Sequence, residues 1–286
     1  MTTWITEALV PAAMFALMVG MGLTLAPADF RRIAAYPRPT VVGTLLQLVA
    51  MPLAGIALAH LFALPPLLAV GLVIVAACPG GTMSNLVAHL GRADAALSVT
   101  LTATATAATL FTLPLWVRAV HDAGGAPLDM PVLETAARLG AFTVLPVALG
   151  MLLRAVRPAL ARFERALSVG SAVVIVAGLA WESSSAGDLP IAESLAPAAW
   201  LCALAFAMGW IVPLATGASA REAATVAIEL CVKNTVLGLV LATSSFDAID
   251  PAVPIAAFMT FQMLGAFVSI GLLWGWARFA VRPVGA

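Results

Sequence analysis

VGLVIVAACPGGTMSNLVAHL, residues Val70–Leu90, is apolar and long enough to cross a bilayer, yet Pro79, Gly80 and Gly81 stand in its middle. Proline lacks a backbone donor and adjacent glycines favour non-helical backbone, so the sequence predicts a helix that is broken near its centre. A simple kink is the alternative for this segment taken alone, because such residues are common in membrane helices.

A second apolar segment, ATVAIELCVKNTVLGLVLA, carries polar side chains at the same depth. It spans residues 224–242 and contains Glu229, Lys233, Asn234 and Thr235, and Lys233 is the only lysine in the chain. A carboxylate at this depth costs several kcal/mol unless it is paired, so we favour a functional role for Glu229. The alternative is a self-neutralising salt bridge between Glu229 and Lys233, four residues apart on one helix.

The composition of the whole chain indicates a multi-pass membrane protein. Apolar residues make up 62% of the 286 residues and charged residues 10%, which is too apolar for a water-soluble domain. The formal net charge is zero and gives no indication of a nucleic-acid partner. A spanning helix needs about 20 apolar residues. The sequence therefore predicts an all-α membrane protein with nine spans, at 7–26, 39–62, 66–90, 95–118, 131–153, 167–182, 190–214, 222–245 and 252–277.

The arginines predict how the chain is oriented in the membrane. Eleven of the fourteen basic residues follow the first, third, fifth, seventh and ninth predicted helices. The positive-inside rule makes these segments cytoplasmic. Because the number of spans is odd, we expect the N-terminus outside and the C-terminus in the cytoplasm.

The two interrupted segments occupy matching places in the chain. Each is the second helix of a three-helix group, 39–118 and 190–277, and the two groups cross the bilayer in opposite senses. This pattern is typical of inverted-repeat transporters, whose discontinuous helices meet at a binding site near the midplane. The helix N-termini at such breaks attract anions, and the freed carbonyls attract cations.

At these motifs the chain closely resembles bacterial members of the bile acid:sodium symporter family. The resemblance rests on CPGGTMSNLVAHLGRADAALSVTLTATAT (78–106) and on GMGLTLAPADFRRIAAYPR (20–38), and it extends over nearly the whole chain. It implies a monomeric transporter of the bacterial inner membrane, with nine helices as in animal members where bacterial members commonly have ten.

The resemblance also implies two domains. A panel domain would comprise 1–37 and 121–187, and a core domain would comprise the two repeats at 38–120 and 188–286. The core would carry broken, crossing helices with breaks at 78–85 and 229–235. Its movement against the panel would alternate access to the two sides of the membrane.

The family's first sodium site can be carried over residue by residue. Its ligands correspond here to Ser84, Asn85, Ser98, Thr102 and Glu229, so each side-chain ligand is retained. Ser98 and Thr102 are four residues apart and share a helix face, and oxygen ligands with one carboxylate suit a hard cation. We expect one Na⁺ there and no organic cofactor.

The family's second sodium site is altered in this chain. The resemblance implies ligands at Gln47, Glu229 and the carbonyls of Leu230 and Val232, but Lys233 stands where the family has a glutamine. An ammonium has no lone pair and cannot coordinate a cation. Our hypothesis is that the ammonium itself replaces the second Na⁺, because one Glu, one Lys and one Na⁺ give the same net charge as one Glu and two Na⁺.

The coupling ion stays open at this point. If Lys233 remains charged, one Na⁺ is coupled to one monoanion. If it loses its proton during the cycle, a proton could take the part of the second Na⁺, and burial and the nearby carboxylate act on the lysine in opposite directions.

The resemblance implies an organic anion as the substrate. Bile acids are transported by animal members, and small carboxylates such as pantoate or 2-oxo acids by bacterial and plastid members. The residues expected beside it are Thr82, Met83, Asn234 and Gln262. Met83 stands where a smaller residue is usual, and Gln262 and Met263 replace a common His-Asn pair, so a small monocarboxylate is the preferred interpretation.

Three classes of function compete. The retained oxygen ligands favour ion-coupled anion symport, and the lone lysine would suit a sodium-independent carrier. An intramembrane enzyme would need a nucleophile with a positioned base or a metal set, and no such constellation is visible in the sequence. We therefore expect a transporter and no enzymatic activity.

Overall fold

The computed structural model describes residues 8–24, 37–123, 145–183, 189–246 and 250–280. Within these ranges the chain is helical and contains no strand, which confirms the predicted all-α fold class. The named helices are α2 (Val10–Thr24), α4 (Pro37–Leu45), α5 (Met51–Leu61), α6 (Pro66–Ala77), α7 (Thr82–Leu90), α8 (Ala95–Ala123), α10 (Glu164–Ser183), α11 (Ile191–Ala215), α12 (Ala220–Cys231), α13 (Thr235–Ser245) and α14 (Ala252–Ala280). A π-helical turn, η3 (Leu46–Ala50), joins α4 to α5, and a 3₁₀ turn, η4 (Pro158–Phe163), precedes α10.

Several of these helices are long and apolar enough to cross a membrane. By length and composition, three described helices qualify, at Pro37–Leu61, Ile191–Ala215 and Ala252–Ala277. A bent pair, Ala95–Thr109 and Phe111–Val120, meets at an angle of 59° and would add a fourth span if the two pieces form one span. Further apolar helices at Pro66–Ala77 and Leu145–Val156 are shorter. The count of nine spans therefore remains a prediction.

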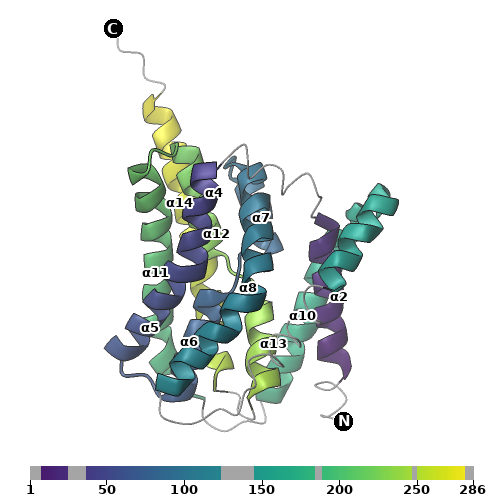
Figure 1. The fold of residues 1–286 in the computed structure, drawn as a ribbon, viewed down its shortest axis with the longest axis vertical. Helices are drawn as coiled ribbons and strands as arrows, with labels where there is room; N and C mark the ends of the chain where they lie inside the picture. Colours follow the sequence, from purple (N-terminus) through teal and green to yellow (C-terminus); the bar gives the residue numbers. More distant parts are fainter. Residues whose placement is uncertain (1–7, 25–36, 124–144, 184–188, 247–249, 281–286) are drawn as a thin grey trace.

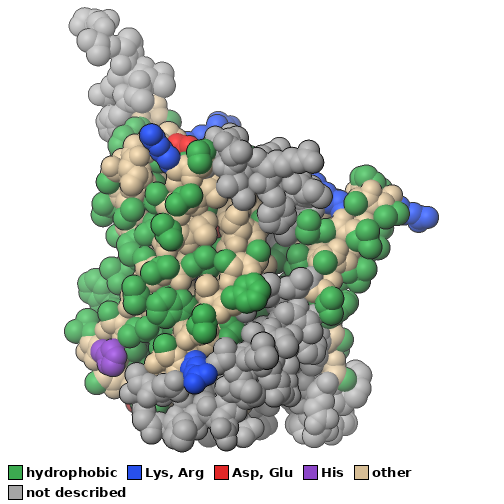
Figure 2. Space-filling view, in the orientation of Figure 1, with side chains coloured by type: hydrophobic (Ala, Val, Ile, Leu, Met, Phe, Trp, Pro, Cys, Tyr) green, Lys and Arg blue, Asp and Glu red, His purple; other side chains and the backbone are tan. Residues whose placement is uncertain are grey.

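The distribution of side chains is that of a protein surrounded by lipid. Large apolar side chains such as Ile211, Leu264 and Phe267 are well exposed, whereas Gln47 and Glu229 are buried. On the face shown in Figure 2, hydrophobic side chains cover the middle of the helices, and charged ones lie toward the two ends. Apolar surface around a polar interior is what the predicted membrane class requires.

The helices form two unequal groups in Figure 1. Helices α2 and α10 pack against each other at one side of the molecule. In the larger group α11 packs against α12 and α14, and α6 packs against α5, α8 and α14. Helix α13 touches both groups, since it contacts α2 and α10 as well as α6 and α14.

Both interrupted segments are broken in the structure, over shorter stretches than the sequence suggested. The first break is Cys78–Gly81, between α6 and α7, and the second is Val232–Asn234, between α12 and α13. Ser84 and Asn85 are already helical, and Glu229 lies in the last turn of α12. Ser84, Asn85 and Glu229 thus lie at helix ends beside the breaks, whereas Lys233 and Asn234 lie within the second break.

The two breaks cross and share backbone hydrogen bonds. The amide of Asn234 donates to Pro79 O at 2.8 Å, and the amide of Gly81 donates to Val232 O at 3.3 Å. Gly80 and Lys233 face each other as an isolated antiparallel bridge. Buried backbone groups need partners, and here each break supplies some of those that the other lacks.

Candidate functional site

The carboxylate of Glu229 lies at the crossing point and is fully buried. Ser84 Oγ donates to its Oε1 at 2.7 Å, and Ser98 Oγ donates to the same oxygen. Thr102 Oγ1 donates to Oε2 at 2.9 Å. Three hydroxyl groups from α7 and α8 therefore surround one carboxylate from α12.

Asn85 completes this group. Its Oδ1 accepts hydrogen bonds from Ser98 Oγ at 2.8 Å and Thr102 Oγ1 at 3.3 Å, while its Nδ2 is buried and has no partner among the described residues. The structure thus brings together the five residues predicted for the first cation site. We call them the Glu229 cluster: Ser84, Asn85, Ser98, Thr102 and Glu229.

The hydroxyl groups of the Glu229 cluster make more contacts to acceptor oxygens than they have protons to donate. Besides its contact with Glu229, Ser84 Oγ lies 2.6 Å from Gly81 O, so the three hydroxyls make six contacts to acceptor oxygens. Each hydroxyl has one proton and two lone pairs, so only three of these contacts can be hydrogen bonds at one time. A hard cation would relieve the surplus of oxygen lone pairs, and the oxygen-only donor set suits such an ion.

Gly80 leaves room for this carboxylate. A Cβ atom at Gly80 would collide with Glu229 Oε2. A Cβ atom at Gly81 would meet Asn234 Cα at 3.5 Å, which is an ordinary contact. Of the two adjacent glycines, only the first is required by the packing around Glu229.

Helix caps hold α8 and α12 in register. Asp94 Oδ1 accepts from the amides of Ala96 and Leu97, both at 3.0 Å, and so caps the start of α8. The amide of Asp94 donates to Thr225 Oγ1 of α12 at 2.8 Å. Ser98 and Thr102 on α8 are thereby fixed opposite Glu229 on α12.

The residues predicted for the second cation site lie near the point where the two breaks cross. None of them forms a hydrogen bond with Lys233 Nζ in the described part of the chain. Gln47, in the π-helical turn η3, is buried, and its Oε1 accepts from the amide of Gly80 at 3.1 Å. Val232 O already accepts from Gly81, and Leu230 is buried within α12. Lys233 Nζ is buried and has no hydrogen-bond partner in the described part of the chain.

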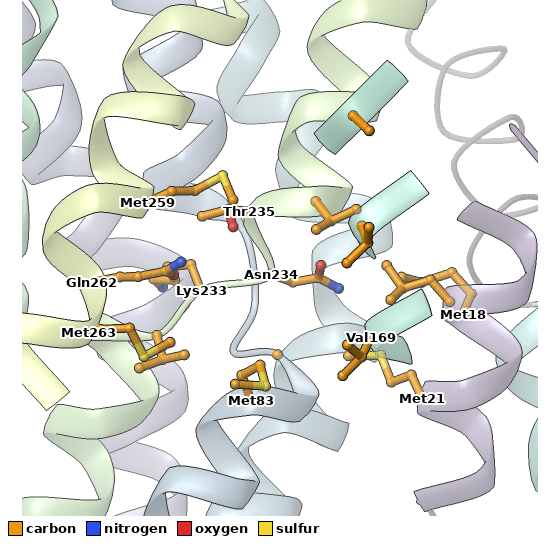
Figure 3. A pocket seen from close by; sticks show the side chains of 16 residues that line it. Met18, Met21, Met83, Val169, Lys233, Asn234, Thr235, Met259, Gln262 and Met263 are labelled. Carbon is orange, nitrogen blue, oxygen red and sulfur yellow. The ribbon is translucent and has the colours of Figure 1, made fainter. Parts of the chain in front are cut away.

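A cavity of about 560 Å³ opens beside the second break, between α2 and α10 on one side and α14 on the other. Figure 3 shows Lys233, Gln262, Met259 and Met263 on one side, Met18, Met21 and Val169 on the opposite side, and Met83 between them at the lower end of the view. Its lining residues are Leu17, Met18, Met21, Gly81, Met83, Val169, Val173, Ala177, Val232, Lys233, Asn234, Thr235, Val236, Met259, Gln262 and Met263.

Three of the four residues predicted to contact substrate line this cavity. They are Met83, Asn234 and Gln262. Asn234 Oδ1 accepts from the amide of Leu237 at 3.1 Å, so this side chain also caps α13. Gln262 Oε1 is buried without a hydrogen-bond partner among the described residues. Thr82 begins α7, but its side chain lies outside what the structure describes.

The sequence interpretation placed Met83 beside the substrate but missed Met18, Met21 and Met259 of the cavity wall. Met18 and Met21 are three residues apart on α2, and Met259 and Met263 are four apart on α14, so each pair shares a helix face. That spacing was a usable signal, because methionine packs adaptably against varied apolar partners.

Comparison with known proteins points to a single family of transporters. The model of the sodium bile acid symporter family matches residues 11–193. The chain is 34% identical to a probable chloroplastic sodium/metabolite cotransporter, BASS1, of Oryza sativa subsp. japonica, over 84% of this chain and 59% of the relative. It is 28% identical to the uncharacterized sodium-dependent transporter YocS of Bacillus subtilis, over 92% of this chain and 81% of the relative.

A more distant relative carries a substrate in its name. The chain is 28% identical to the human ileal sodium/bile acid cotransporter, over 80% of this chain and 67% of that protein. The chain spans 59% of the length of the rice relative. These relatives are named as transporters and not as enzymes, in agreement with the expectation from sequence.

Proposed function

Because the chain belongs to the sodium bile acid symporter family, we propose that it is a multi-pass secondary transporter that couples the uptake of a small organic anion to sodium. The names of its relatives support sodium coupling. Small monocarboxylates such as pantoate or a 2-oxo acid are the preferred substrates, and bile-acid-like anions are the larger alternative.

The Glu229 cluster is the observation that carries this proposal. We propose that one Na⁺ binds there, with the hydroxyls of Ser84, Ser98 and Thr102, the amide oxygen of Asn85 and the carboxylate of Glu229 as ligands. The hydroxyls can rotate so that their lone pairs face the ion. The surplus of acceptor oxygens supports a cation at this point and disfavours an anion or a neutral ligand.

Lys233 takes the place of a second sodium ion in this proposal. Lys233 lies in the second break, and its backbone pairs with that of Gly80, whose amide donates to Gln47 Oε1. Glu229, Lys233 and one Na⁺ together carry a net charge of +1, which favours a monoanion in the adjoining cavity.

The architecture fits movement of one group of helices against the other. In our proposal α2, the helix Leu145–Val156 and α10 belong to a panel domain, and the other helices form the core of a nine-span protein with its C-terminus in the cytoplasm. The cavity lies between α2 and α10 on one side and α13 and α14 on the other, where alternating access would open and close it.

Uptake into proteoliposomes tests sodium coupling. With a Na⁺ gradient directed inward, we expect accumulation of labelled substrate at least about tenfold above that in an equal K⁺ gradient. Empty liposomes are the control. Equal uptake in Na⁺ and K⁺ would reject the proposal.

A sodium-independent or proton-coupled carrier is the second candidate. The unpartnered Lys233 Nζ beside the cavity favours it. In the same proteoliposomes, uptake driven by a pH gradient without Na⁺ would select this alternative.

Lys233→Gln should change the number of sodium ions required. The substitution restores the glutamine of the family pattern and removes the positive charge of Lys233. A second Na⁺ is then needed to give the site the same net charge of +1. We expect the Hill coefficient of Na⁺-dependent substrate binding to rise from about 1 toward 2. An unchanged Na⁺ dependence would show that Lys233 is not a sodium surrogate.

A further inference from the structure

We propose that Lys233 Nζ is the direct partner of the transported anion, and that the cavity selects a monocarboxylate with an apolar body. This inference rests on the proposed function, because it names what the transporter's cavity binds. It keeps the charge that the surrogate role assigns to Lys233 and adds a direct contact between the ammonium and the substrate carboxylate.

The first step is the lack of a hydrogen-bond partner for the ammonium. Lys233 is 4% exposed, and its Nζ has no hydrogen-bond partner among the described residues. The carboxylate of Glu229, four residues earlier, accepts instead from Ser84, Ser98 and Thr102. A buried ammonium that makes no hydrogen bond is costly, so an anion that accepts from it in the cavity would be favoured.

The second step is the position of the ammonium. Lys233 lies in the non-helical break between α12 and α13, and its side chain lines the cavity. Gln262 of α14 lines the same cavity, and Figure 3 shows the two side chains on one side of it. The proposed head-group site is therefore the ammonium of Lys233 with the amide of Gln262 beside it.

The third step is the number of charges. Among the described residues that line the cavity, Lys233 is the only charged one. A single ammonium balances one carboxylate and leaves the second carboxylate of a dianion unpaired in an apolar space. The cavity should therefore discriminate against dicarboxylates as well as against neutral analogues.

The fourth step is the apolar lining around the head-group site. Five methionines line the cavity, namely Met18, Met21, Met83, Met259 and Met263. Flexible thioether side chains adapt to apolar groups of different shape. A volume of about 560 Å³ lies in the range of roughly 300–1,000 Å³ that holds drug-sized ligands. Within the monocarboxylates of the proposed function, an apolar body of about six to ten carbons would fill this surface more fully than a shorter or more polar one.

Thermal unfolding of the purified protein, with probes of matched length, tests the proposal. The probes are octanoate, octanamide and octanedioate at fixed Na⁺, with hexanoate and decanoate to vary the body. We expect octanoate to raise Tm at concentrations at least tenfold below those needed for octanamide or octanedioate. Lys233→Met should raise the octanoate concentration needed at least tenfold, and Lys233→Arg should keep the preference for carboxylate over amide.

Two results would overturn the inference. One is octanoate binding to Lys233→Met as tightly as to the wild type. The other is a wild-type protein that responds equally to octanoate and octanamide, or to none of the three monocarboxylates.

Sodium alone, without any anion, separates this inference from the proposed function. A rise of Tm with Na⁺ in the wild type and in Lys233→Met shows that both proteins are folded and that the cation site works. If Na⁺ has no effect while octanoate binding depends on Lys233, sodium coupling fails and the head-group site stands. If Na⁺ acts as expected and Lys233→Met keeps its octanoate affinity, the head-group site fails and sodium coupling stands.

Discussion

Glu229→Gln is expected to abolish the response of this protein to sodium. The carboxylate is the one charged member of the Glu229 cluster, and it is fully buried. Removing one partner of a buried charge pair costs about 3–5 kcal/mol, which corresponds to a loss of roughly 100-fold or more in Na⁺ affinity. Tm measured against Na⁺ concentration should therefore be flat over a range in which the wild type is stabilised.

The same substitution should not unfold the protein. Glutamine has nearly the same shape, its oxygen can accept from Ser84 and Ser98, and Thr102 can rotate to accept from its amide. Without Na⁺, the variant should still unfold cooperatively, because the shape of the side chain and its hydrogen-bonding capacity are kept.

Glu222→Gln is the matched control in the same helix. Glu222 lies in the exposed first turn of α12, and its carboxylate accepts from the amide of Ser219 at 2.7 Å in a capping box. Glutamine serves equally well in this motif. The control should keep the full Na⁺ response, and a Na⁺ response that survives in Glu229→Gln would contradict the assigned site.

Gly80→Ala is expected to disrupt the same site by packing alone. The added methyl group would collide with Glu229 Oε2, so either the carboxylate or the crossing backbone must move. Overpacking of this kind typically costs about 1–3 kcal/mol. Since Gly80 also pairs with Lys233 and donates to Gln47, we expect a lowered Tm together with weaker Na⁺ binding.

Gly81→Ala is the neighbouring control. Its methyl group would lie 3.5 Å from Asn234 Cα, and the φ of −109° at this residue is ordinary for alanine. We expect a change in stability of less than about 1 kcal/mol and an unchanged Na⁺ response. Equal effects of the two substitutions would show that general disturbance of the break, and not the collision with Glu229, is responsible.

The sequence was sufficient to locate both breaks and the polar cluster. Pro79 and the two glycines disrupt helical hydrogen bonding by local chemistry, and a carboxylate within an apolar segment stands out by its cost of burial. The residues assigned to the first cation site by family resemblance do converge on Glu229 in the structure. Their role as sodium ligands remains a proposal.

Other features depend on contacts between distant segments, and local sequence does not encode them. Lys233 is four residues after Glu229, and a continuous helix would place the two on one face. Instead α12 ends at Cys231, because the backbone that follows pairs with the first break, so the ammonium lies beside the cavity. The methionines of the wall come from α2 and α14, whose proximity to the breaks is a property of the packed bundle.

The hydrogen-bonded crossing of the two breaks restricts how this protein can vary. Asn234 pairs with Pro79, and Gly81 pairs with Val232, so these two hydrogen bonds fix the register of one break against the other. An insertion or deletion in either break would shift its register against the other and leave buried amides without acceptors. Side-chain substitutions at the two breaks should therefore be tolerated more readily than a change in the length of either break.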